Sequence, residues 1–99
     1  MSLLVHYTLK DAGDHAHQVD AMKELVAGLK AAGISGLNYS CFTTDDPTKF
    51  VGVLEFADDA AKAGFLGSDA FEAYKARVGP TFANPPQTVE IEAVSSTRG

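Results

Sequence analysis

Histidine and tyrosine are the side chains of this sequence that could best carry out chemistry on a small organic molecule. His6 lies in the run LLVHYTLK, where it alternates with Val5 and Tyr7 and so projects from one face of a strand. An imidazole titrates near pH ~6.5 and can take a proton from a phenol or enol at neutral pH. His6 is therefore a candidate catalytic base. The competing interpretation is a histidine held in an interface or at the edge of a pocket.

The tyrosines offer an apolar ring with a polar tip, which can hydrogen-bond a substrate oxygen. Tyr74 falls on the same helical stripe as Phe71, so we expect it to face the sheet, and it is the second catalytic candidate. Packing in the core, with the hydroxyl reaching solvent, is the alternative for any one of them. The residues expected to bind substrate are Tyr7, Tyr39, Phe65, Phe71 and Phe82.

Other reactive side chains have simpler explanations. Cys41 has no base next to it in the sequence, and we expect a small buried hydrophobic residue. His15 and His17 are two residues apart at a helix start, so they do not face each other; we expect exposed side chains and no metal site. Glu55 lies within a strand and predicts either a salt bridge or a buried carboxyl with a raised pKa. No nucleotide-binding glycine motif is present.

Composition limits the class of protein. A chain of 99 residues fits one domain, spanning 1–99. The net charge of −5 argues against binding to nucleic acid or to an anionic membrane surface. The single cysteine cannot form an internal disulfide, and we see no signal peptide or membrane span in the sequence. We therefore expect a cytoplasmic protein.

Hydrophobic periodicity predicts four strands and a broken second helix. Asp14 is expected to cap the first helix and Gly33 to end it. After the break, Ser68 or Asp69 is expected to cap the new helix, and Asp69 with Glu72 matches a capping box. The predicted strands are 3–10, 37–44, 49–56 and 87–94, and the predicted helices are 15–32, 59–66 and 69–78.

The first helix has one clear apolar face in the sequence. Val19, Met22, Val26 and Leu29 recur at steps of three and four, whereas Gln18 is assigned to another face. This regular spacing makes the first helix the clearest element of the chain.

The order strand–helix–strand–strand–helix–strand predicts an α+β, ferredoxin-like fold with a four-stranded antiparallel sheet in the order 4-1-3-2. Both helices would then cover one sheet face. The third strand carries Phe50, Leu54 and Phe56 on one side and Val51 and Val53 on the other. A second copy of the same sheet would cover the other face, so we expect a homodimer through that face.

Several segments, in this order and at this spacing, carry a resemblance to a known family. They are Lys10–Gly13 after the first strand, Ile34–Tyr39 before the second, the Asp46-Pro47 turn, and the segments 53–61 and 65–71. Together the segments resemble the antibiotic biosynthesis monooxygenase-like domains of the dimeric α+β barrel superfamily.

The resemblance implies a ligand pocket between sheet and helices. It implies cofactor-independent oxidation of a small aromatic or quinone-like molecule, without metal or flavin. It argues against haem degradation, because this chain has no tryptophan and has Phe65 where haem-degrading members have a histidine. The alternatives are a non-catalytic dimer that binds a small molecule or acts as an accessory protein, and an assembly module whose pocket its own phenylalanines fill.

Overall fold

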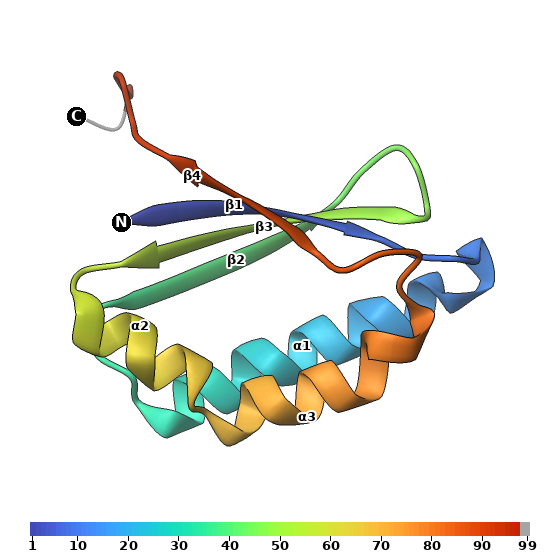
Figure 1. Ribbon diagram of the computed structural model, residues 1–99, viewed down its shortest axis with the longest axis horizontal. Helices are drawn as coiled ribbons and strands as arrows, with labels where there is room; N and C mark the ends of the chain where they lie inside the picture. Colours follow the sequence, from blue (N-terminus) through green and yellow to red (C-terminus); the bar gives the residue numbers. More distant parts are fainter. Residues whose placement is uncertain (98–99) are drawn as a thin grey trace.

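A computed structural model describes residues 1–97, so the last two residues of the predicted domain lie outside the description. A layer of helices lies against one face of a four-stranded sheet (Figure 1). In chain order the elements are β1 (Ser2–Thr8), η1 (Ala12–Asp14), α1 (His15–Ala32), β2 (Leu37–Thr43), β3 (Lys49–Phe56), α2 (Asp59–Leu66), α3 (Asp69–Val78), η2 (Gly79–Thr81) and β4 (Gln87–Ile91).

The sheet has the order β2-β3-β1-β4, and every neighbouring pair is antiparallel. This confirms the predicted ferredoxin-like α+β fold and its strand order. The central strand β1 pairs with β3 on one side and β4 on the other, so Leu4 lies between Val53 and Val89. Residues paired in this way point to the same face of the sheet.

The entry to α1 differs from the prediction. Asp14 stands at the N-cap position but makes no side-chain capping hydrogen bond. Instead, the Asp11 carboxylate accepts from the Gly13 N–H and sets up the short turn η1, so the helix grows out of a preceding 3₁₀ turn. Gly33 ends α1 as predicted, in the left-handed conformation with φ 64°.

The buried face of α1 is also rotated from the predicted one. Gln18 is fully buried, together with Met22, Leu25 and Leu29, whereas Val19 and Val26 are only half-buried. The spacing 18, 22, 25, 29 is itself helical, so the position assigned to a polar residue belongs to the core stripe. The prediction missed it because glutamine is mostly an exposed residue.

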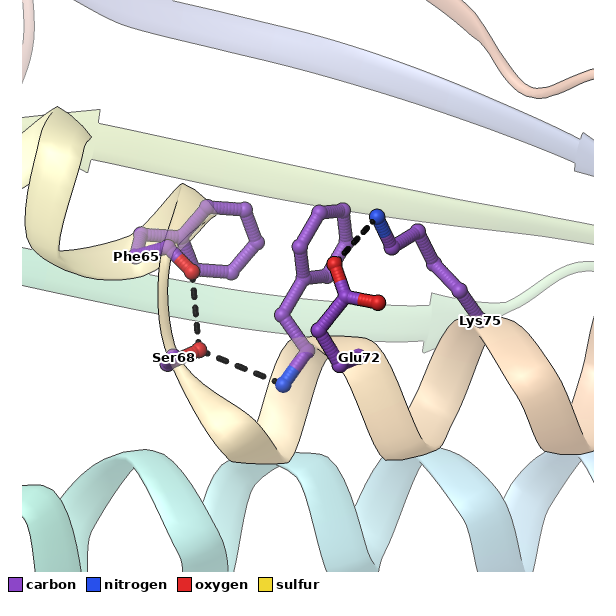
Figure 2. Close-up of polar contacts among 5 residues, drawn as sticks. Phe65, Ser68, Glu72 and Lys75 are labelled. Atoms are coloured by element: carbon purple, nitrogen blue, oxygen red, sulfur yellow. Dashed lines mark hydrogen bonds and ion pairs between the residues drawn. The ribbon is translucent and has the colours of Figure 1, made fainter.

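The second helical region is broken as predicted, and Ser68 begins the new helix. Its hydroxyl accepts from the Phe71 N–H at 3.2 Å and donates to the Phe65 carbonyl at 2.8 Å, which links the end of α2 to the start of α3 (Figure 2). Of the two caps that the sequence predicted, Ser68 is confirmed, whereas Asp69 and its capping box with Glu72 are wrong.

Strand β4 ends at Ile91, three residues earlier than predicted. Its partner sets the limit, because Ile91 lies opposite Ser2, the first residue of β1. Beyond Ile91, β1 offers no paired residue for Ala93, although the alternation of Val89, Ile91 and Ala93 continues in the sequence.

The two sheet faces have different surroundings. The helices α1, α2 and α3 lie on one face of the sheet, and within residues 1–97 the other face carries no α-helix (Figure 1). The core between sheet and helices consists of Val5, Tyr7, Leu9, Ala21, Met22, Leu25, Leu29, Phe50, Leu54, Phe56, Ala61, Phe65, Tyr74 and Val78. We call the opposite side the open face; the pairing register places Leu4, His6, Phe42, Val51, Val53, Val89 and Ile91 on it.

A glycine lets α1 and α3 pack closely. A Cβ atom added at Gly28 would lie 2.7 Å from the Ala70 Cβ, which is too short for a carbon–carbon contact. We expect Gly28→Ala to lower the free energy of unfolding by about 1–2 kcal/mol in urea titrations, because overpacking outweighs the better helix propensity of alanine.

The swap variant Gly28→Ala/Ala70→Gly keeps one methyl group at this crossing. It should recover to within about 0.5 kcal/mol of the unchanged protein, because the propensity terms cancel. An equally unstable swap would show that the contact between the two helices is not the cause.

No helix within residues 1–97 is both long enough and apolar enough to cross a membrane.

Candidate functional site

A cavity of about 500 Å³ lies between the sheet and the pair α2–α3. Its walls come from β1, β3, α2, α3, β4 and the loop before β4. Such a volume suits a small organic ligand. The lining residues are Leu3, Val5, Tyr7, Leu54, Phe56, Lys62, Phe65, Leu66, Phe71, Tyr74, Lys75, Gly79, Phe82, Pro85, Pro86 and Thr88.

Tyr74 is the buried polar group that α3 brings to this cavity. Its hydroxyl accepts a hydrogen bond from Gln18 Nε2 at 2.8 Å. A phenol has one proton to donate and two acceptor positions. With one acceptor position occupied, the Tyr74 O–H remains available to donate to a ligand oxygen.

Tyr7 and Tyr39 form a second hydroxyl pair, with their Oη atoms 2.9 Å apart. Tyr7 lines the cavity, and Tyr39 stands behind it from β2. Gly52 allows the two rings to meet: a Cβ atom there would lie 3.1 Å from Tyr39 Cε1 and 3.2 Å from Tyr7 Oη. Tyr39 therefore orients Tyr7 and does not line the cavity itself.

Burial holds all three tyrosines in the neutral form at ordinary pH. Loss of hydration raises the pKa of Tyr7 to about 12, partly offset by its hydrogen bond with Tyr39. Loss of hydration also raises the pKa of Tyr39 and of Tyr74, and in both cases the neighbouring Tyr7 adds to the effect. These phenols can therefore donate hydrogen bonds but do not serve as bases at neutral pH.

Aromatic rings form the walls without closing the cavity. The ring centroids of Phe65 and Phe71 are 4.5 Å apart, and Phe82 stacks on Tyr7 at 5.9 Å. Phe65, Phe71 and Phe82 thus lie together with Tyr7 and Tyr74 around one cavity, as the sequence predicted. Because the space between them is open, the interpretation of a pocket filled by its own phenylalanines finds no support.

His6 does not share this cavity. It is exposed on the open face, while its neighbours Val5 and Tyr7 are buried on the helix side. Successive residues of a strand point to opposite faces, so the His6 side chain points away from the cavity that Tyr7 lines. The expectation that His6 serves as the base in the pocket between sheet and helices is corrected accordingly.

Cys41 and Glu55 pack and form hydrogen bonds within the sheet and do not line the cavity. Cys41 is half-buried in the sheet, and burial raises the pKa of its thiol, which suits a small packing residue. Glu55 is exposed on the open face, where it accepts from Asn38 Nδ2 at 3.2 Å. This cross-strand hydrogen bond replaces the buried carboxyl and the cross-strand salt bridge, whereas a salt bridge to a second copy stays a prediction.

His15 and His17 are half-buried, so the prediction of exposed side chains was wrong. His15 Nδ1 lies 2.8 Å from the Pro47 carbonyl, and its ring packs 4.9 Å from that of Phe50. His17 Nε2 lies 3.4 Å from the Arg77 carbonyl. Partners distant in the sequence bury these rings. Among residues 1–97, no group of three His, Cys, Asp or Glu side chains could hold a metal ion.

No protein-family model matches the chain, and no curated protein matches it significantly. The chain does match solved structures. A "putative antibiotic biosynthesis monooxygenase" from Caulobacter crescentus superposes with a TM-score of 0.82 at 22% identity, over 95% of this chain and 89% of that one. Proteins of the same description from Bacteroides thetaiotaomicron (TM-score 0.80, 16% identity, 98% and 91% covered) and Nitrosomonas europaea (0.78, 15%, 96% and 100%) also match.

The chain has the fold of the antibiotic biosynthesis monooxygenase-like domains. At these identities the likeness concerns the fold.

Within this monooxygenase-like fold, the sequence prediction missed several cavity residues. Lys62 precedes Phe65 by three positions, and Lys75 follows Phe71 by four. Helical spacing places each lysine beside a predicted pocket aromatic, so this signal was readable. Pro85 and Pro86 lie in a loop, where no periodicity could have indicated their position.

Proposed function

We propose that this protein is a cofactor-independent monooxygenase-like enzyme that oxidises a small aromatic or quinone-like molecule in the cavity between sheet and helices. One observation carries the proposal: a cavity of about 500 Å³ has mostly apolar walls and two neutral tyrosine hydroxyls, those of Tyr7 and Tyr74. The names of the structurally similar proteins support the same class of reaction.

The reaction can be balanced without a metal or flavin when the substrate supplies the electrons. A hydroquinone and O₂ give a hydroxyquinone and water. One oxygen atom forms a new bond to a ring carbon, and the other leaves as water with two hydrogens. The substrate loses four electrons, so no external reductant is consumed.

In this reaction the protein binds and orients the substrate. The Tyr74 O–H donates to a substrate oxygen and stabilises negative charge that develops on it during oxidation. Tyr7, held by Tyr39, provides a second polar contact. The aromatic walls exclude water from the ring that reacts.

We further propose that the chain forms one domain and works as a homodimer through its open face. Apolar residues of this face are exposed on both edge strands of the sheet: Phe42 of β2 is 52% exposed, and Val89 of β4 is 50% exposed. Soluble monomers rarely leave such patches uncovered. His6 would then lie in the dimer interface. A reducing cytoplasm suits the unpaired Cys41.

Removing one hydroxyl tests the role of the cavity. We expect Tyr74→Phe to lower kcat/KM for a hydroquinone substrate by about tenfold to a hundredfold, the effect of losing one hydrogen bond to a charged group. Oxygen uptake measures the rate, and ¹⁸O₂ should place one labelled atom in the product. The hydroquinone panel should include single-ring and fused-ring compounds.

Stability must be separated from catalysis, because Tyr74→Phe also removes the hydrogen-bond partner of Gln18. The double variant Gln18→Met/Tyr74→Phe removes that unpaired amide and provides a better-folded comparison with the same catalytic defect. Normal turnover in both variants would exclude Tyr74 from the reaction. Loss of turnover in His6→Ala with cavity binding intact would move the chemistry to the open face.

A non-catalytic binding protein is the second candidate, favoured by the lack of any histidine, aspartate or glutamate among the described residues lining the cavity. It predicts ligand binding in the cavity with no oxygen uptake for any hydroquinone in the panel.

A further inference from the structure

The cavity carries positive charge in a protein that is acidic overall. The chain has 13 acidic and 8 basic residues, yet among the described residues lining the cavity the charged ones are Lys62 and Lys75. Both stand toward solvent, Lys62 half-buried and Lys75 exposed, whereas the inner walls are buried aromatic and aliphatic side chains. We call Lys62, Leu66, Lys75 and Pro86 the cavity mouth.

Lys75 is held above the aromatic wall. Its Nζ lies 4.7 Å from the centroid of the Phe71 ring and 2.8 Å from Glu72 Oε1 (Figure 2). The Lys75 and Glu72 side chains are 50% and 66% exposed, so their ion pair is weak and exchanges readily with solvent. An ammonium group has three donors, and the remaining ones are free for a ligand.

Lys62 reaches the same mouth from α2. No ion pair of this lysine is found in the described part of the chain. Glu72 pairs with Lys75 and does not itself line the cavity. The residues lining the mouth therefore include two cations and no anion, and Glu72 beside the mouth offsets part of the charge of Lys75.

We propose that the ligand of this cavity is an organic anion, with an aromatic or quinone-like body inside and a carboxylate or ionised hydroxyl beside Lys62 and Lys75. This inference rests on the proposed function and adds the charge of its substrate class. The apolar interior takes the body, and charge attraction at the mouth fixes which end enters first. The neutral tyrosines then meet the inner end of the ligand.

Two fluorescent probes that differ by one anionic group test the proposal. Anilinonaphthalene sulfonate and neutral N-phenyl-1-naphthylamine have the same ring body, and the sulfonate of the first stands in for a carboxylate. We expect the anionic probe to bind about tenfold more tightly at low salt, with the difference shrinking as NaCl is added.

Lysine variants locate the effect. Lys62→Gln and Lys75→Gln should each raise the Kd of the anionic probe about threefold to fivefold and leave the Kd of the neutral probe unchanged. Glu72→Gln should lower the Kd of the anionic probe about twofold, because it frees Lys75 from its partner. Lys23→Gln, exposed on α1 and outside the cavity, is the matched control.

The outcomes separate this inference from the proposed function. Equal affinities for the two probes, unaffected by Lys62→Gln and Lys75→Gln, would overturn the charged-ligand inference and leave the apolar cavity in place. Failure of both probes to bind would overturn the proposed small-molecule site itself. Equal loss of anionic-probe binding in Lys23→Gln would show that overall charge, and not the mouth, governs affinity.

Discussion

Val53→Asp is expected to separate the two copies of the proposed dimer. Val53 lies in the middle of the open face, beside Leu4 of β1 and Ser40 of β2. In a sheet-to-sheet dimer this position is desolvated, and each copy would bury a carboxylate that has no partner. The dissociation constant should rise by about a thousandfold or more, which light scattering after gel filtration would detect.

A control with the same change of charge separates the interface from general effects. Ala16→Asp adds one carboxylate to the exposed first turn of α1, on the helix side of the molecule, where a negative charge suits the helix dipole. It should remain dimeric. If the unchanged protein is a monomer, or if Val53→Asp keeps the mass of two chains, the open face is not the interface.

The stability of the protein should fall steeply above pH ~10. The folded state holds the Tyr7 proton more tightly than the unfolded state, with a pKa of about 12 against an ordinary value of 10.0. The contribution of Tyr7 to stability is therefore complete below the pKa of the tyrosine in the unfolded chain. It is lost as the pH rises through the pKa of Tyr7 in the folded protein. Above the unfolded pKa, each tyrosine that keeps its proton only in the folded state lowers the free energy of unfolding by about 1.4 kcal/mol per pH unit. Three such tyrosines lower it by about 4 kcal/mol per pH unit.

All three tyrosines of the chain belong to this cluster, and no tryptophan interferes with their absorbance. Urea unfolding curves recorded between pH 8 and pH 11, with near-ultraviolet absorbance of tyrosinate, therefore measure the effect directly. Tyrosinate should appear together with unfolding. Tyr39→Phe should reduce the slope by about a third. Ionisation near pH ~10 in a protein that stays folded would contradict the effect of burial.

Local patterns were enough to predict most of the architecture. The break at Gly67 and Ser68, the left-handed Gly33 and the alternation in β3 are all readable over a few residues. Their order then leaves few topologies to consider, because crossover handedness and short connections restrict the rest. The strand order followed from these rules.

The candidate site was only partly predictable, because long-range contacts decide it. The alternation of His6 and Tyr7 showed that they point to opposite faces but not which face the helices cover. The burial of Gln18 depends on Tyr74, which is 56 residues away. The end of β4 depends on where β1 begins. Sequence patterns describe a residue's own element, whereas these features depend on a second element.

The position of β1 also has a consequence for how the chain is made. This first strand is central, and both of its neighbours lie far along the sequence: Ser2 pairs with Glu55 on one side and with Ile91 on the other. During synthesis β1 leaves the ribosome long before β3 and β4 have been made. Until then, its backbone N–H and C=O groups have no strand to pair with. Closing such long loops slows folding. The sheet can be completed only when the last strand has emerged, so a nascent chain stalled before Gln87 would leave one edge of β1 unpaired.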